Sequence, residues 1–528
     1  MKLRVSLIIV FLFGLALFQG GCVKEPVVLS GEGLHLKYSC DTLTFDTVFT
    51  TMGTATANLK VYNPYDEPVR IATITLDGGY ASRFRLNVDG DTSMRVSSTV
   101  VEPHDSLFIF VQANINPNSS LTPFLVEDAI AFHIDGASSV DRVVLTAYGR
   151  NACYHLPDHV IHDQYGNAYP YSIINCREWD HTRPHVIMGY AVVDEDSLLV
   201  LNAGEELYFG SQAVLWVYDG GTLRVEGSGE QPVLFSSVRH DGHYDYLPGQ
   251  WGYIWLSTGS RDNVVDYAVV ENATIGLLCD TMAGTNPTLA VTNSVVRNMS
   301  MAGIVGQGSW IEGDNLLVYN CQTATLALQY GGRYRFGTST FSNYWPYGAR
   351  KSPSIVLNNY YTYGQTIYAR PLTEVSFSNC IVAGNYSEGE LLFDAIPEAA
   401  FNLSFDHCLL AADSAVVAAA ARVAGNIYGK RRRPLFVDTA ADNYHLLPDS
   451  PARAAGTTQG RRTAADLDGV TWDATPSMGA YEYVDTSLLN QRKYYRQCST
   501  ISPASWPKSI QPTQWSTATG LATRLKLR

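Results

Sequence analysis

The pattern of apolar and polar positions is most regular between residues 263 and 413, where short apolar runs are bracketed by Asn, Asp or Ser. Asparagine closes successive runs about every 22–26 residues, at Asn272, Asn298 and Asn320. Runs this short, rich in Val, Ile and Leu and separated by Gly or Asn, indicate strands rather than helices. A strand pattern with this period is typical of stacked repeats.

Stacked short strands predict a coil in which each turn of chain hydrogen-bonds to the next. Similar residues then recur at one height, as Cys380 and Cys408 do in their copies. Asparagine suits the corners because it tolerates left-handed dihedrals, and its amide can bond the equivalent amide one turn away. The predicted fold is therefore all-β, with a right-handed parallel β-helix as its main domain. An ordinary β-sandwich with accidental spacing is the alternative.

The rest of the chain divides by the same criterion. Residues 27–150 show alternating strands about every 8–12 residues with turn clusters between them, which predicts an immunoglobulin-like β-sandwich. Residues 151–194 are interpreted as a linker or N-terminal cap, and residues 195–433 as the β-helix. A closing segment follows at 434–483. Residues 484–528 are rich in Ser, Thr, Pro and Gln without apolar periodicity, so they are predicted to be disordered.

Residues 1–22 carry an export signal. Lys2 and Arg4 precede an apolar run, and Gln19-Gly20-Gly21-Cys22 follows it. This resembles a bacterial lipoprotein signal, which implies that Cys22 bears lipid and tethers the protein to the outer membrane, exposed at the cell surface. A plain signal peptide cleaved nearby and an uncleaved anchor are the alternatives. No other apolar run approaches the ~20 residues that span a bilayer.

A second resemblance lies in the residues that lead into the repeats. Gly220-Gly221-Thr222-Leu223, Pro232-Val233-Leu234-Phe235 and Pro248-Gly249-Gln250-Trp251 resemble the entry coils of right-handed β-helix proteins of the pectate-lyase-like group. Met478-Gly479-Ala480-Tyr481 resembles the closing segment of that group, which implies that residues 434–483 cap the open end of the coil. The whole chain resembles a Bacteroidetes-type surface lipoprotein with a sandwich followed by a β-helix. This resemblance is specific for architecture and says little about activity.

The composition of the chain argues against some classes of function. The 528-residue chain has a formal net charge of −13, which argues against non-specific nucleic-acid binding. Its nine cysteines show no C-x-x-C spacing, so neither a zinc site nor a redox site is predicted. No cofactor is expected, and Ca²⁺ enters only if the protein is a lyase.

The densest polar cluster precedes the turn at Pro248. It could ligate a metal or carry acid–base chemistry, although bracing of the coil is the preferred interpretation; its members are Arg239, His240, Asp241, His243 and Asp245. A lyase on this fold needs Ca²⁺-binding carboxylates with a basic residue, and a hydrolase needs paired carboxylates. The acidic residues of the repeats are scattered, and Lys351 is the one lysine between residues 198 and 429. No catalytic residue is therefore predicted.

Aromatic residues cluster late in the repeats, with arginine among them. Such rings suit stacking against sugars, or they cover the exterior of the coil; the candidates are Tyr330, Arg333, Tyr334, Trp345, Tyr347, Tyr361 and Tyr363. The predicted function is a lipid-anchored cell-surface protein that binds a glycan, or host or matrix material, without catalysis. The alternatives are a polysaccharide lyase or glycoside hydrolase acting on acidic polysaccharide, and a purely structural or adhesive surface protein.

Overall fold

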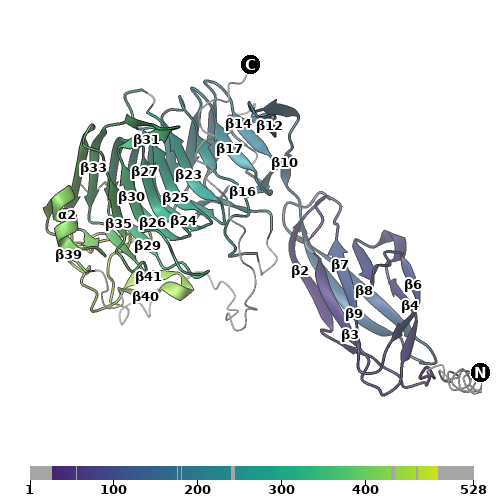
Figure 1. Cartoon of the computed structure of the whole chain (residues 1–528). Helices are drawn as coiled ribbons and strands as arrows, with labels where there is room; N and C mark the ends of the chain where they lie inside the picture. Colours follow the sequence, from purple (N-terminus) through teal and green to yellow (C-terminus); the bar gives the residue numbers. More distant parts are fainter. Residues whose placement is uncertain are drawn as a thin grey trace, which may run out of the picture. The chain divides into compact units, whose positions relative to one another are not determined.

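The computed structural model describes residues 27–485, apart from 55, 175–176, 180, 240–243, 283, 430–434 and 460–461. The chain forms two compact units, one ending at Asn151 and the other starting at Ala152. The fold class is as predicted: a β-sandwich followed by a right-handed parallel β-helix (Figure 1). Cys22 and the predicted export signal lie outside the described residues. Within the described part, no helix is long and apolar enough to cross a membrane.

The first unit packs two sheets face to face. Buried and exposed residues alternate along its strands, so each sheet turns one face to a core that includes Val61, Ile109 and Phe132. One sheet has the order β2-β9-β8-β4-β6 and the other β1-β3-β7-β5. The elements are β1 Lys37–Tyr38, β2 Thr42–Phe49, β3 Ala57–Tyr62, β4 Val69–Leu76, η1 Gly79–Ala81, β5 Phe84–Val88, β6 Arg95–Val101, β7 Ser106–Ala113, β8 Phe124–Ile134 and β9 Asp141–Arg150.

The chain of the second unit forms a coil. Each full turn adds one strand to a ten-stranded sheet, and most turns add two strands to an 18-stranded sheet. The strands of the 18-stranded sheet form two parallel ladders, and each of these turns adds one strand to each ladder. The ten-stranded sheet contains β11 His159–His162, β12 Ala168–Ile174, β14 Tyr190–Val193, β17 Val214–Val217, β20 Ile254–Leu256, β23 Ile275–Asp280, β25 Ala302–Gln307, β27 Ala324–Gln329, β30 Ile355–Asn358 and β35 Leu391–Asp394.

The 18-stranded sheet bends between its two ladders, and β24 and β26 run through both. It contains β10 Cys153–His155, β13 His185–Ile187, β15 Leu198–Asn202, β16 Glu206–Phe209, β18 Thr222–Glu226, β19 Val233–Ser237, β21 Asn263–Asp266, β22 Ala268–Glu271, β24 Leu289–Met299, β26 Trp310–Cys321, β28 Gly332–Gly337, β29 Thr340–Asn343, β33 Leu372–Ser378, β34 Ile381–Gly384, β36 Phe401–Asp406, β37 Leu409–Leu410, β38 Arg422–Ala424 and β39 Ile427–Tyr428.

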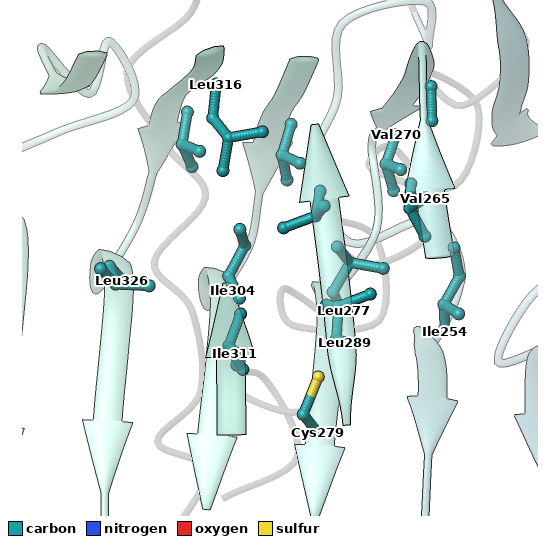
Figure 2. Close-up of a cluster of buried hydrophobic side chains, with 14 of the residues drawn as sticks. Ile254, Val265, Val270, Leu277, Cys279, Leu289, Ile304, Ile311, Leu316 and Leu326 are labelled. Carbon is teal, nitrogen blue, oxygen red and sulfur yellow. The ribbon is translucent and has the colours of Figure 1, made fainter. Parts of the chain in front are cut away.

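Parallel register stacks like residues inside the coil. Ile254, Leu277, Ile304 and Leu326 lie opposite one another on successive strands of the ten-stranded sheet (Figure 2). All four are fully buried, which ties each turn to the next through one continuous core.

Asparagine forms the corners, as the repeat pattern predicted: Asn272, Asn298 and Asn320 adopt positive φ of 63°, 58° and 51°. Asn293 and Asn315 adopt positive φ, 49° and 56°, at the bend between the two ladders. The Asn315 Nδ2 donates to Asn293 Oδ1 at 2.8 Å. At the predicted corner the amide contact between successive turns is longer: Asn298 Nδ2 donates to Asn272 Oδ1 at 3.4 Å. The corner at Asn293 and Asn315 was not named by the prediction.

The parallel ladder starts earlier than residue 195. β10 pairs with β13, and β12 pairs with β14, both within the segment predicted as linker or N-terminal cap. Trp179 is buried at this end of the core and stacks on His155 and on His185, with ring centroids 4.2 and 4.4 Å apart. The first turn is therefore part of the coil, and its polar residues obscured the strand pattern.

The closing segment covers the flank of the coil, and not its end as the resemblance implied. Leu435, Tyr444 and Met478 pack on Leu317 and Ile381, whose side chains point outward from the second ladder. Helix α2 (Ser414–Ala420) instead lies at the last turn, where its Val417 joins the main core. The flank needs cover because its outward row is apolar. The segment contains β40 Phe436–Asp438, η2 Thr439–Ala441 and β41 Asn443–Leu446.

Candidate functional site: the tyrosine face of the β31–β32 hairpin

A hairpin projects from the coil between β30 and β33. It consists of β31 (Tyr360–Tyr363) and β32 (Thr366–Ala369), with Tyr361 opposite Tyr368. Gly364 takes φ 61° in the two-residue turn, a conformation that favours glycine. Because side chains alternate along a strand, Tyr361, Tyr363 and Tyr368 share one side of the hairpin.

These rings and the neighbouring Tyr330 form a surface, here called the tyrosine face: Tyr330, Tyr361, Tyr363 and Tyr368. The rings of Tyr361 and Tyr368 stack with centroids 4.8 Å apart and planes 9° apart. Tyr330 meets Tyr361 edge-on at 5.7 Å, and the guanidinium of Arg370 lies 5.4 Å from the Tyr361 ring. Tyr363 and Tyr368 are both exposed, so the face offers ring surface to a ligand.

The base of the hairpin is firmly held. The side chain of Asn359 is buried, donates to the carbonyls of Ile396 and Ala399 at 2.9 Å, and accepts from the Ile396 amide at 2.8 Å. The Tyr330 amide donates to Asn358 Oδ1 at 2.7 Å. The tyrosine face therefore sits on an ordered support, which lowers the entropy lost on binding.

Polar side chains line the same end of the ten-stranded sheet. Asp280, Gln307 and Gln329 are adjacent on β23, β25 and β27, and Asn358 is adjacent to Asp394 on β30 and β35. The register places them in one outward row that leads to the hairpin. Amides and carboxylates of this kind can hydrogen-bond sugar hydroxyls.

Asp280 is an acid of this row whose pKa is raised. Its carboxylate is buried beside Trp255, whose Nε1 donates to it at 2.8 Å. Burial raises the pKa of Asp280 to about 6, and the Trp255 hydrogen bond acts in the opposite direction. Burial, and then the charge of Asp280, raise the pKa of Tyr330.

The predicted binding residues do not all converge. Tyr330, Tyr361 and Tyr363 meet in the tyrosine face, whereas Arg333 lies on β28 and pairs with Glu374 at 3.0 Å. Tyr334 was a wrong choice: its ring is fully buried in the coil, and its hydroxyl donates to the Gly331 carbonyl at 2.9 Å. It follows Arg333 on the strand, so alternation turns it inward.

Trp345 and Tyr347 lie in the loop before β30, at the opposite end of that strand from the hairpin. Trp345 is buried and contacts Tyr347 edge-on at 5.1 Å, so it also was a wrong choice for sugar stacking. Tyr347 is partly exposed, and its hydroxyl donates to the Tyr246 carbonyl at 2.6 Å. This pair therefore holds two loops together.

Tyr368, which completes the face, and Arg370, which lies beside Tyr361, were not among the chosen residues. The segment Tyr361-Thr362-Tyr363-Gly364-Gln365-Thr366-Ile367-Tyr368 alternates aromatic and polar positions around a glycine turn. That pattern predicts a hairpin, and it would have placed Tyr368 beside Tyr361.

The polar cluster before Pro248 is only partly described. The Arg239 guanidinium lies 3.2 Å from the centroid of the Tyr244 ring, and the Asp245 carbonyl accepts from Asn272 Nδ2 at 2.8 Å. His240, Asp241 and His243 lie outside the described residues. Among the residues that are described, no group of three or more His, Cys, Asp or Glu could hold a metal ion.

No protein-family model and no curated protein matches this sequence. Several solved structures resemble it, among them the following three, each at 10% identity. A family 123 glycoside hydrolase from Clostridium perfringens aligns over 27% of this chain and 26% of its own, with a TM-score of 0.18. The pectate lyase Pel9A aligns over 63% and 88%, with a TM-score of 0.31. A GH87 α-1,3-glucanase from Streptomyces thermodiastaticus strain HF3-3 aligns over 70% and 75%, with a TM-score of 0.22. At these scores the likenesses identify neither substrate nor activity.

Proposed function

We propose that this is a lipid-anchored protein of the cell surface that binds a glycan, of the cell's surroundings or of a host, through the tyrosine face without cleaving it. The observation that carries the proposal is the stacked Tyr361–Tyr368 pair on an anchored hairpin, with the exposed ring of Tyr363 at its tip. Exposed aromatic rings are costly in water, and they gain contact area when the apolar face of a sugar stacks on them.

Within the outward row, the spacing of the acidic residues supports binding without cleavage. A hydrolase needs two carboxyl groups about 5 to 9.5 Å apart. In the outward row, Asp280 and Asp394 are separated by four strand steps, or about 19 Å at the usual strand spacing. The row members next to Asp280 and Asp394 on neighbouring strands are Gln307 and Asn358, which carry amides.

The test is a glycan array probed with the full chain and with the variant Tyr363→Ala/Tyr368→Ala. Loss of two stacking surfaces should weaken binding about tenfold or more, without a change in Tm. Tyr165→Ala is the matched control, because Tyr165 and Tyr363 are each 77% exposed and Tyr165 lies in the β11–β12 turn. Equal binding by the double variant would remove the tyrosine face from the proposal.

One observation favours polysaccharide cleavage as a second candidate function. The buried carboxyl of Asp280, with its raised pKa, has the character of an acid–base catalyst. Incubation with uronate polymers and with neutral glucans, followed by assays for unsaturated products and for new reducing ends, separates the two functions. Cleavage that is lost in Asp280→Asn would establish the enzyme; no product from the wild-type chain supports binding alone.

Lipid anchoring is tested at Cys22. The wild-type chain should incorporate labelled palmitate and fractionate with outer membranes, and surface protease should reach it on intact cells. Cys22→Ser should lose the label and leave the membrane fraction. A labelled Cys22→Ser chain would show that the lipid is attached elsewhere.

A further inference from the structure

The outer face of the β1-β3-β7-β5 sheet of the sandwich carries exposed aromatic rings and cations that could form a second binding surface. On β3 and β7 the outward residues Lys60 and Phe108 are paired, and Asn58 pairs with Phe110. Asn87 flanks Phe110 from β5. Phe108 and Phe110 are 40% and 41% exposed although they lie in the middle of the sheet. Water therefore reaches the rings of two residues whose backbone positions are about 7 Å apart along one strand.

The charge of this face is opposite to that of the chain. The strands of the sheet, β1, β3, β7 and β5, contain Lys37, Lys60 and Arg85 and no Asp or Glu, whereas the whole chain carries −13. The acidic residues nearest in sequence, Asp89 and Asp105, lie in the turns that end β5 and precede β7. The other sheet of the sandwich differs, because its strands contain Asp46, Glu127, Asp128 and Asp141.

Cations and rings are interleaved on this face. The Lys60 ammonium lies 5.0 Å from the centroid of the Phe108 ring. Lys37 pairs with Tyr62 in the neighbouring row, and Tyr62 is also exposed. One Arg85 nitrogen, Nη1, already donates to the carbonyls of Ser82 and Phe84, which holds that guanidinium at the edge of the sheet.

We propose that this face, defined by Lys37, Asn58, Lys60, Tyr62, Arg85, Asn87, Phe108 and Phe110, binds an acidic polysaccharide of the hexuronate class. The sugar rings stack on Phe108 and Phe110, and their carboxylates pair with Lys60 and Lys37. The amides of Asn58 and Asn87 on either side of Phe110 hydrogen-bond sugar hydroxyls. This surface belongs to the first unit, so the inference does not rest on the tyrosine face.

The interleaving is what favours a polysaccharide. Each apolar ring on this face has a cation or an amide beside it, which matches a ligand that repeats an apolar ring face and a carboxylate at every unit. An anionic lipid surface would be attracted by the same cations, and it is therefore an arm of the test.

The experiment is affinity electrophoresis of the full chain through gels that contain polygalacturonate. Polygalacturonate should retard the wild-type chain, and salt should weaken the retardation because the ion pairs are exposed. Phe108→Ala/Phe110→Ala should lower the affinity about tenfold or more. Tyr148→Ala is the control, because Tyr148 is 45% exposed on the other sheet. It should bind as the wild type does.

Two further variants test the roles of the cations and of the tyrosine face separately. Lys37→Gln/Lys60→Gln retains both rings and should weaken the retardation and flatten its salt dependence. Tyr363→Ala/Tyr368→Ala should still show the retardation by polygalacturonate that depends on Phe108 and Phe110. A failure of the proposal for the tyrosine face can therefore be told apart from a failure of the proposal for this face of the sandwich. The inference is overturned by equal retardation in neutral hydroxyethylcellulose, by an unchanged Phe108→Ala/Phe110→Ala variant, or by binding to phosphatidylglycerol vesicles without binding to polygalacturonate.

Discussion

At the scale of single residues, burial decides what an acidic group contributes. Asp280 is buried next to Trp255, and its pKa rises to about 6 because the charged form has lost water. An acid whose folded pKa lies above its unfolded value lowers stability when it ionises. Asp280 therefore costs stability as pH rises from about 4 to 6, and the full cost persists above that range.

Replacing Asp280 by Asn should remove this cost while an oxygen remains to accept from Trp255. Above pH 6 the variant should be more stable than the wild type by about 2–3 kcal/mol, since each unit of pKa shift is worth about 1.4 kcal/mol. The difference should vanish below pH 4. Denaturant unfolding from pH 4 to 8 measures it, and a difference independent of pH would contradict the assignment.

Arg350 and Glu390 form a fully buried ion pair that ties the loop before β30 to the loop before β35. Two nitrogens of Arg350 donate to Glu390 at 2.8 and 2.9 Å, and Glu390 also accepts from the Ser354 amide at 2.9 Å. Removing one partner leaves the other charge buried.

Arg350→Met should therefore cost about 3–5 kcal/mol of unfolding free energy. The double variant Arg350→Met/Glu390→Leu should cost less than either single change. A double-mutant cycle measured by urea unfolding checks this, and additive single costs would show that the pair does not interact.

The same scale shows where sequence reasoning failed. Tyr334 and Tyr363 both stand in tyrosine-rich, glycine-containing segments, yet one is fully buried and the other is exposed. The difference is a matter of register: β28 belongs to the coil, so every second side chain points into the core, whereas β31 belongs to a projecting hairpin. Composition identifies a candidate surface, but strand pairing decides which residues reach it.

At the scale of elements, the sequence predicted features that depend on neighbouring residues, but it did not predict contacts between distant segments. The Asn corners at Asn272, Asn298 and Asn320 follow from short-range chemistry, so the repeat pattern predicted them. The closing segment binds residues 100 to 140 positions earlier: Ala480 donates its amide to Thr340 Oγ1 at 3.0 Å, and Gly479 donates to the Asn379 carbonyl at 2.7 Å. Nothing in the sequence of the closing segment indicates which part of the coil it packs against.

Gly479 offers a test of that docking. It has φ 94°, and a β-carbon there would lie 2.6 Å from Thr340 Oγ1 and 2.7 Å from Ile381 Cδ1. Gly479→Ala should cost about 2–5 kcal/mol and loosen residues 435–485, because strain and overpacking add.

Gly284→Ala is the matched control for Gly479→Ala. Gly284 has a similar φ of 82° but nothing within 4 Å of an added β-carbon. It should cost about 1 kcal/mol, from backbone strain alone. Hydrogen exchange of the closing segment measures both variants, and equal exchange in the two would contradict the flank contact.

At the scale of the whole molecule, two separate cores predict two unfolding events. The sandwich core includes Ile109 and the coil core includes Leu326, and both residues are fully buried. The boundary at residue 151 falls next to the one drawn from strand spacing, because each unit has its own pattern of alternation. The coil architecture was likewise predictable from the repeat.

Ile109→Ala should cost its own unit about 2–5 kcal/mol and lower one thermal transition by several degrees. The transition of the coil should stay in place. Leu326→Ala should act in reverse, and calorimetry resolves the two. If each variant shifted both transitions equally, the units would not unfold separately.

The most direct test of glycan binding at the tyrosine face is hydrogen exchange of the full chain with and without an oligosaccharide found on the array. Because ligand contacts slow local opening, amides from Tyr330 and from residues 358–370 should gain protection, while those of the Trp345–Tyr347 loop should not. Bound oligosaccharide that leaves the hairpin amides unprotected would contradict the account.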